Sequence, residues 1–124
     1  MNVLLDTDIA IEILRARDLA IVAKWTRLAG ANIEILCSPV VVAEIWAGAR
    51  ASESKTIDAF FDALTCATAD YDTGQIAGEL LRRYARSHSL EVPDALIAAA
   101  ALQHQAALWT RNRKHYPVPQ LAFY

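Results

Sequence analysis

Val3-Leu4-Leu5-Asp6-Thr7-Asp8, at the start of the chain, is the segment on which the expected fold depends. Its three apolar residues predict a short buried strand. The chain then reaches an acid, a hydroxyl and a second acid, and a helical pattern follows at once. In an open α/β sheet, ligands bind outside the carboxyl ends of the strands. Asp6 follows directly on such an end, so its role depends on which later carboxylates lie near it.

Length and composition predict one domain over residues 1–124, since a chain of this size buries roughly two thirds of the surface that its unfolded form exposes. Hydrophobic residues make up 55% of the sequence, but no segment is long and uncharged enough to span a bilayer. Trp25, Trp46 and Trp109 stand in apolar contexts and are expected in the core. Met1 leads directly into the first strand, without the pattern of a secretion signal. We therefore expect a cytoplasmic protein that does not enter a membrane.

Net charge and the two cysteines further limit the classes of protein to which the chain can belong. The net charge of −2 excludes a uniformly basic nucleic-acid-binding protein. Basic residues nevertheless cluster within 111–115 and 82–86, and either cluster could contact phosphates; for the second, interaction with a helix dipole is the favoured explanation. Cys37 and Cys66 lack the spacing of metal ligands, so we expect two small buried residues in a reducing compartment.

Helical and strand-like patterns alternate along the rest of the chain. Apolar residues spaced three and four apart predict helices, and short β-branched runs between breakers predict strands. The expected helices cover residues 9–14, 19–29, 40–49, 57–64, about 72–86 and 93–105, and the expected strands cover 3–5, 33–37, 66–69, 107–110 and 121–124. Asp18, Ser38 and Asp72 are the expected N-caps of three of these helices. This alternation implies right-handed crossovers, so the predicted fold is α/β, with a mainly parallel sheet covered by helices on both faces.

Three acids stand at positions where a carboxylate needs an explanation. Asp6 ends a strand, Glu44 lies inside the apolar run Val40–Trp46, and Asp94 falls in the first turn of a helix. Asp6 or the nearby Asp8 could simply cap the following helix, and Asp94 could favour its own helix through the dipole. Glu44 could occupy the one wet face of its helix, although a buried carboxylate without a partner is costly. The sequence alone leaves each of these explanations open.

Convergence of the three acids would make a metal site. Their repulsion would raise at least one pKa, and a divalent cation would remove that penalty. The available ligands are oxygens, with no Cys or His at zinc-type spacing, and hard cations such as Mg²⁺ prefer oxygen ligands. A bound Mg²⁺ polarises a phosphoryl oxygen and lowers the pKa of a bound water. The acids therefore suggest hydrolysis of a phosphate ester.

Four segments of the chain resemble the motifs of the PIN-domain nucleases and, within that family, of the small VapC-type toxins of toxin–antitoxin pairs. They are LLDTD, VVVAEIWAGA, VPDALIAAAA and LWTRNRKHY, which occur in the family's order and span nearly the whole chain. The first three place the family's acids at Asp6, Glu44 and Asp94. The fourth places its hydroxyl at Thr110 and puts Asn112 where some members carry Asp, so that position keeps a coordinating oxygen without the charge.

The resemblance implies a PIN-like three-layer α/β/α sandwich and an Mg²⁺-dependent endoribonuclease, with Mn²⁺ as a substitute metal. On this basis Asp6 and Asp94 would be the principal metal ligands. Glu44 would complete the acidic cluster and orient a metal-bound water. Thr110 and Asn112 would position a water or a phosphate.

The resemblance also assigns roles outside the acidic centre. Asp8 stands where the family often has a small hydroxyl or amide residue, and it is either a supporting outer acid or only a helix cap. The basic turn of Arg111, Arg113 and Lys114 would hold the RNA backbone. Family precedent further implies a homodimer and a cognate antitoxin protein that wraps the toxin and occupies its cleft.

Two other functions remain open. Asp6-Thr7-Asp8 also fits the nucleophile pattern of haloacid-dehalogenase-like phosphatases, in which Asp6 would form an aspartyl-phosphate and Asp8 would act as acid and base. Ala10 stands where those enzymes usually have Thr or Val, and their later Lys and paired acids are missing at convincing positions. A catalytically inactive PIN-like module that binds RNA or protein is the second alternative. Asn112 favours it, and the three acids argue against it.

Overall fold

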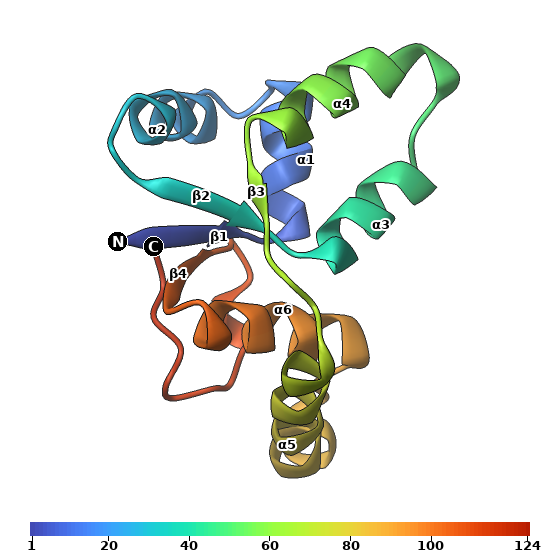
Figure 1. Ribbon diagram of the computed structural model, residues 1–124, viewed down its shortest axis with the longest axis vertical. Coiled ribbons are helices and arrows are strands. Elements are labelled where there is room, and N and C mark those ends of the chain that lie inside the picture. Colours follow the sequence, from blue (N-terminus) through green and yellow to red (C-terminus); the bar gives the residue numbers. More distant parts are fainter.

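A four-stranded parallel sheet forms the centre of the computed structural model, which describes residues 1–124 (Figure 1). The strands, in the spatial order β3-β2-β1-β4, are β1 (Asn2–Leu5), β2 (Glu34–Cys37), β3 (Thr65–Cys66) and β4 (Ala106–Trp109). Leu5 is level with Cys37 on one side and with Trp109 on the other. The first strand of the sequence therefore lies inside the sheet, and its three apolar residues are completely buried.

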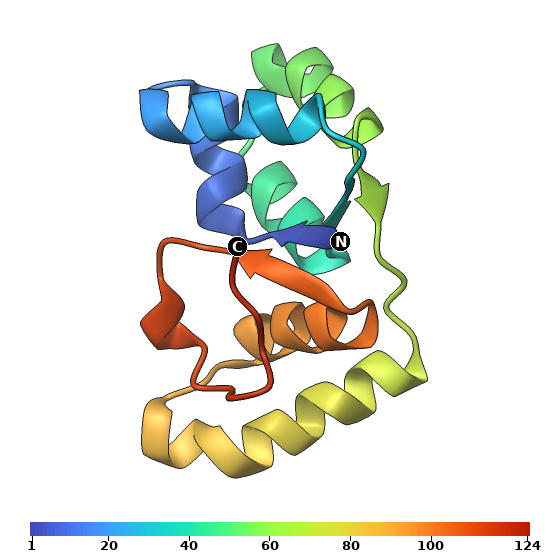
Figure 2. The same cartoon turned by 90° about the vertical axis from the view of Figure 1, so that its left-hand side faces the viewer.

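Six α-helices cover this sheet. They are α1 (Thr7–Arg15), α2 (Leu19–Ala29), α3 (Pro39–Ala47), α4 (Ser54–Asp62), α5 (Tyr71–His88) and α6 (Val92–Gln103). Helices α1, α2 and α4 lie on one side of the sheet and α6 lies on the other, where α5 packs against it (Figure 1, Figure 2). Helix α3 contacts both α1 and α6. The predicted three-layer α/β/α arrangement around a small parallel sheet is confirmed.

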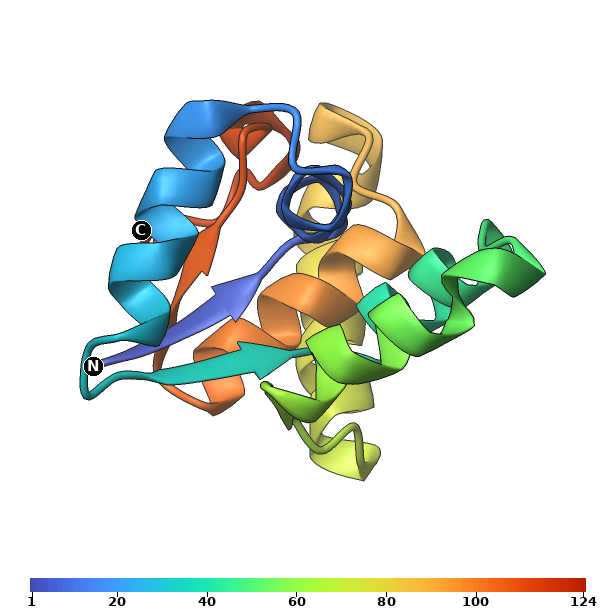
Figure 3. The ribbon, with the colours of Figure 1, turned by 90° about the horizontal axis from the view of Figure 1, so that it is seen from above.

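The direction in which strands are added changes between β1 and β4. From β1 the chain moves outward to β2 and β3, and it returns through α5 and α6 to place β4 on the opposite side of β1. Figure 3 shows β4, β1 and β2 side by side in that order. Ligand crevices of open α/β sheets form at such a point, outside the carboxyl ends of the strands. Asp6, Ser38 and Thr110 directly follow β1, β2 and β4 at this edge.

Local capping explains where several helices begin. Asp18 accepts hydrogen bonds from the backbone of α2, and Ser38 accepts one from the N–H of Val40 at 3.2 Å, as predicted. Helix α5 corrects the third prediction, because its N-cap is Asp70 and not Asp72. The Asp70 carboxylate accepts from the N–H of Thr73, and the Thr73 hydroxyl accepts from the N–H of Asp70, both at 3.1 Å. The buried Thr73 fixes the N-cap two residues earlier than the spacing of Asp72 and Gln75 predicted.

Other elements differ from the sequence predictions at the periphery. The expected strand 66–69 is the two-residue β3, and the expected strand 121–124 makes only a single bridge, between Leu108 and Phe123. Helix α5 continues past its expected end near residue 86 and ends at His88. These segments lie at the edges of the sheet and the ends of helices, where few neighbours constrain the backbone.

Two side chains predicted as buried lie at the surface. Trp46 is 37% exposed, and Cys66 is exposed whereas Cys37 is buried. Both exceptions fall on elements at the margin of the molecule, since α3 covers only part of the sheet and β3 is its edge strand.

The core between the layers is continuous. Helix α6 buries a run of small side chains against the sheet, namely Ala95, Ala98, Ala99, Ala100 and Ala101. Alanines let a helix approach its neighbours closely. Burial also explains why α6 carries no charge between Asp94 and its end, since an unpaired buried charge is costly. None of the helices has the length and hydropathy needed to cross a membrane.

Candidate active site

Asp6 is fixed at the carboxyl end of β1 by three hydrogen bonds. Its N–H donates to the carbonyl of Trp109 at 3.0 Å. Its Oδ1 accepts from the N–H of Thr7 at 2.8 Å, and its Oδ2 accepts from the hydroxyl of Thr110 at 2.7 Å. The residue is only 7% exposed. Asp6 therefore caps α1, as one reading of the sequence held, and it also faces the end of β4.

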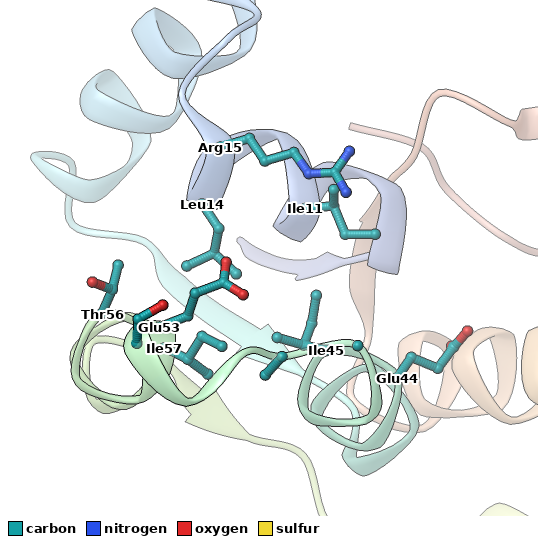
Figure 4. Close-up of a pocket in the computed structure, with 11 residues that line it drawn as sticks. Ile11, Leu14, Arg15, Glu44, Ile45, Glu53, Thr56 and Ile57 are labelled. Carbon is teal, nitrogen blue, oxygen red and sulfur yellow. The ribbon is translucent and has the colours of Figure 1, made fainter.

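Glu44 reaches the same edge from α3. Its Oε1 accepts a hydrogen bond of 2.9 Å from the hydroxyl of Thr7, the residue that follows Asp6. The residue is exposed, which agrees with the interpretation that it lies on the solvent-facing side of an apolar helix. Figure 4 shows the Glu44 side chain extending away from the other labelled residues, toward the side of α6. Glu44 can therefore be exposed to solvent and still lie beside Asp6.

Asp94 lies in the first turn of α6 and is half-buried. Burial raises its pKa above the ordinary value of 3.8, and the negative charge of Asp6 raises it further. The positive charge of His115 acts in the opposite direction, and Glu44 adds a smaller increase. The charges of Asp6 and Glu44, which are dozens of residues away in the sequence, thus both act on Asp94 at one edge of the sheet.

The acids do not form a tight cage. No three Asp, Glu, His or Cys side chains lie close enough together to hold a metal ion between them. Mg²⁺ takes one or two protein carboxylates and keeps several waters, so such a cage is not required for that ion. The donors at this edge are carboxylate, hydroxyl and amide oxygens, and the repulsion that raises the pKa of Asp94 is relieved by a cation. The donor set therefore fits Mg²⁺ and not zinc.

Asp8 holds the loop after β4. Its Oδ2 accepts from the N–H of Arg111 at 3.0 Å and from the side-chain amide of Asn112 at 3.2 Å. Burial raises the pKa of Asp8, and the charge of Asp6 contributes in the same direction. The backbone of Asn112 also donates to the hydroxyl of Thr110 at 3.0 Å. Thr110 and Asn112 are thus connected to the acids, through Asp6 and Asp8 respectively.

Arg111 lies among three carboxylates. Its guanidinium makes ion pairs with Asp8 at 3.7 Å, Glu12 at 3.4 Å and Asp18 at 3.9 Å. The residue therefore joins the loop after β4 to α1 and to the start of α2. Its positive charge is largely compensated, which makes it a poorer RNA contact than the sequence indicated.

The rest of the basic turn forms the 3₁₀ helix Arg113–His115 and remains exposed. Arg113 lies over the ring of Phe123, with its guanidinium carbon 5.1 Å from the ring centre. Lys114 has no ion-pair partner among the acids that compensate Arg111. Arg113 and Lys114 are therefore the better placed of the three predicted RNA-binding residues.

Tyr116 belongs to the site, although the sequence patterns did not indicate it. Only 3% of its surface is exposed, and its hydroxyl has no hydrogen-bond partner in the protein. Burial is the main cause of its raised pKa, and the charges of Asp6 and Asp94 raise it further. A tyrosine directly after a basic turn is the only sequence signal, and such a residue is most often core.

A pocket of about 350 Å³ adjoins the acidic centre on the side of Glu44 (Figure 4). It lies between α1, α3 and the segment that leads into α4. Its wall is apolar at Ile11, Leu14 and Ile45, and it also carries Arg15 and Glu53. The pocket is thus distinct from the centre itself but shares Glu44 with it.

Comparison with known proteins identifies the family of this chain. The sequence matches the PIN domain family over residues 3–121, and the chain belongs to this family. It is 39% identical to Ribonuclease VapC19 of Mycobacterium tuberculosis over 116 residues, which cover 93% of this chain and 92% of that protein. It is 31% identical over 121 residues to Ribonuclease VapC10 of the same organism, covering 94% of this chain and 86% of that protein. The resemblance inferred from the four motifs is confirmed.

Solved structures of toxin–antitoxin complexes share the fold. The structure of VapBC2 from Rickettsia felis, bound to a DNA fragment from its promoter, contains a chain that superimposes with a TM-score of 0.83 at 26% identity, covering 100% of this chain and 98% of that one. A chain of VapBC-1 from nontypeable Haemophilus influenzae superimposes with a TM-score of 0.81 at 20% identity, covering 100% and 97%. The second likeness supports the fold alone.

Proposed function

We propose that the protein is an Mg²⁺-dependent endoribonuclease and the toxin of a type II toxin–antitoxin system. One observation carries this proposal: Glu44 reaches Thr7, the residue after Asp6, by a hydrogen bond, and the charges of Asp6 and Glu44 both act on Asp94 at the sheet edge. They do so in a chain that is 39% identical to a protein named as a ribonuclease.

Asp6 and Asp94 would hold the ion, and Mn²⁺ would substitute for Mg²⁺. When bound, the ion would polarise a phosphoryl oxygen and lower the pKa of a water molecule. Glu44, which is already oriented by Thr7, would orient the attacking water. Thr110 keeps Asp6 in position, and Asn112 would contribute its amide oxygen to a water or phosphate.

The exposed basic turn supports RNA as the substrate. Arg113 and Lys114 are exposed on the 3₁₀ helix, and His115 is close enough for its charge to act on Asp94. Cationic side chains bind phosphates without regard to base sequence. They would hold the RNA backbone beside the acids, whose own negative charge repels it until a cation is bound.

The phosphatase alternative is less compatible with this geometry. An acid–base group must be free to exchange a proton with substrate, but Asp8 Oδ2 is held by Arg111 and Asn112 and its Oδ1 is buried. The inactive-module alternative rests on Asn112 alone. The presence of all three acids at one edge favours the enzyme.

Partner binding is the second part of the proposal. A cognate antitoxin would wrap the protein, and the pocket beside Glu44 offers apolar residues next to the charges of Arg15 and Glu53. Solved VapBC complexes with the same fold support such a partner. A homodimer and a cytoplasmic location complete the proposal.

A direct test is incubation of the purified protein with mixed RNAs, with Mg²⁺ or with EDTA, beside Asp6→Asn. We expect cleavage only with the divalent ion and only with Asp6 intact. Hydrolysis of p-nitrophenyl phosphate is the matched assay for the phosphatase. Cleavage in EDTA, equal cleavage by Asp6→Asn, or preference for the phenyl phosphate would refute the proposal.

A further inference from the structure

The hydroxyl of Tyr116 is a buried polar atom without a partner in the protein. The backbone around it is fixed, since its N–H donates to the carbonyl of Arg113 at 3.0 Å and its carbonyl accepts from the N–H of Val118 at 2.8 Å. An unsatisfied buried group of this kind destabilises the folded protein. Such groups in folded proteins usually contact a water or an ion, or take part in function.

The hydroxyl faces the acidic centre. After burial, the largest influences on its pKa are the charges of Asp6 and Asp94. The Asp6 carboxylate also raises this pKa as a nearby hydrogen-bond acceptor, although no hydrogen bond of normal geometry forms between them, and the charge of Asp8 contributes last. All of them act in the upward direction, so the phenol stays a neutral hydrogen-bond donor. It is a donor that faces carboxylates, which accept hydrogen bonds when ionised.

A second unpaired atom borders the same centre. Asp8 Oδ1 is buried and has no hydrogen-bond partner, although Oδ2 of the same carboxylate has two. Asp8 Oδ1 is thus an unpaired buried acceptor on the residue two positions after Asp6, and the Tyr116 hydroxyl is an unpaired buried donor whose pKa the same acids raise. Buried waters typically make two to four hydrogen bonds to groups that would otherwise be unsatisfied.

We propose that Tyr116 is a positioning residue of the acidic centre, whose hydroxyl donates to a water molecule that Asp8 Oδ1 also binds. The water carries the influence of Tyr116 to Asp6 and Asp94, and it stabilises the arrangement that binds the cation. The inference rests on the proposed function in that Mg²⁺ is the cation. Outer partners of metal ligands typically contribute 10- to 100-fold to metal affinity or activity.

The substitution Tyr116→Phe removes the hydroxyl and keeps the ring. We expect it to weaken Mg²⁺ binding by about tenfold in calorimetry, and to lower kcat with little change in the KM for RNA. Thermal stability in EDTA should not fall, because the removed group is unpaired in the protein. Tyr84→Phe, the same change on α5 against His88, should leave the Mg²⁺ affinity unchanged.

NMR spectroscopy tests the role of Tyr116 without an activity assay and with Tyr116 itself unchanged. The chain has four tyrosines, so the ring-carbon NMR signals of Tyr116 can be assigned by elimination from Tyr71→Phe, Tyr84→Phe and Tyr124→Phe. Mg²⁺ should shift the Tyr116 signals and leave those of Tyr84 in place.

The outcomes separate this inference from the proposed function. Equal Mg²⁺ affinity in the wild-type protein and Tyr116→Phe, or an unmoved Tyr116 signal at saturating Mg²⁺, overturns the role of Tyr116 and leaves the nuclease intact. A wild-type protein that binds no Mg²⁺ overturns both. A fall in thermal stability of Tyr116→Phe in EDTA, with unchanged Mg²⁺ affinity, assigns the hydroxyl a purely structural role.

Discussion

Thr110 Oγ1 donates a hydrogen bond of 2.7 Å to Asp6 Oδ2 across a separation of 104 residues. The same hydroxyl accepts from the backbone of Asn112. The bond joins the ends of β1 and β4, which are neighbours in the sheet only because β4 is added on the far side of β1. It orients one carboxylate oxygen of Asp6 while the N–H of Thr7 holds the other.

Replacing Thr110 by Val should therefore destabilise the protein and weaken the site. The change leaves the buried Asp6 Oδ2 without its donor, and an unsatisfied buried acceptor costs about 1–3 kcal/mol. Thr110→Ser keeps the hydroxyl, so its free energy of unfolding should fall by less than half as much as that of Thr110→Val. Urea unfolding in EDTA measures the free energy of unfolding, and RNA cleavage with Mg²⁺ measures the site. Equal stability of the Val and Ser variants would show that the hydrogen bond contributes nothing.

Asp94→Asn should make the metal-free protein more stable at pH 7. Burial, and then Asp6, raise the pKa of Asp94 above its ordinary value of 3.8. The folded protein therefore binds more protons than the unfolded chain between the two pKa values, and stability from this group is lost as pH rises through that interval. Asparagine does not ionise, so Asp94→Asn does not lose this stability as the pH rises. The difference in stability between the wild-type protein and Asp94→Asn should vanish below about pH 3.8, where Asp94 is protonated in both the folded and the unfolded state.

Thermal unfolding in EDTA from pH 3 to pH 8 measures this difference, with Asp58→Asn on the exposed side of α4 as a control. Addition of Mg²⁺ should reverse the order, because a ligand that binds only the folded state stabilises it. RNA cleavage by Asp94→Asn should fall by at least about 100-fold, since even outer partners of a metal contribute 10- to 100-fold. A variant less stable than the wild-type protein in EDTA at pH 7 would contradict the assigned repulsion.

Much of this architecture follows from local sequence signals. The apolar strand before Asp6, the Ser38-Pro39 helix start and the charge-free α6 are each specified by neighbouring residues. The alternation of these elements then predicts a parallel sheet, whose carboxyl edge collects the residues after the strands. Glu44 could be anticipated because an acid inside an apolar helix requires a reason.

The remaining features depend on partners distant in sequence. Arg111 looked like a free cation, but it is compensated by acids about 100 residues earlier in the chain. Asp70 and Asp72 are equally good caps by type, and the burial of Thr73 selects between them. The significance of Tyr116 lies in what its hydroxyl faces, which no spacing rule encodes.

Arg111→Gln should affect stability more than RNA binding. The change removes ion pairs that join the loop after β4 to α1 and α2, at a cost of about 1 kcal/mol for a half-exposed network. Arg82→Gln, which breaks an exposed pair with Glu79 on α5, should cost less than about 0.5 kcal/mol. Chemical unfolding measures both.

Lys114→Gln is the complementary variant. Its stability should stay near that of the wild-type protein, while RNA affinity falls and the slope of log K against log salt decreases by about 0.7 for the lost phosphate contact. Binding is measured in Ca²⁺ with Asp6 intact, at several salt concentrations. If Arg111→Gln weakens RNA binding more than Lys114→Gln does, the carboxylates around Arg111 do not compensate its charge as the distances indicate.

RNA with a single 2′-deoxy substitution at the scissile nucleotide should still be cut and should leave a 5′-phosphate. The acids at the sheet edge are suited to hold a cation and an attacking water, so the substrate's own 2′-hydroxyl is not needed as the nucleophile. Mass spectrometry of the product ends, beside the all-ribo substrate, measures the outcome. A 2′,3′-cyclic phosphate, or complete loss of cutting with binding intact, would show that the 2′-hydroxyl attacks and that Glu44 does not orient a water. The deoxy substrate thus separates the two chemistries without altering any residue of the protein.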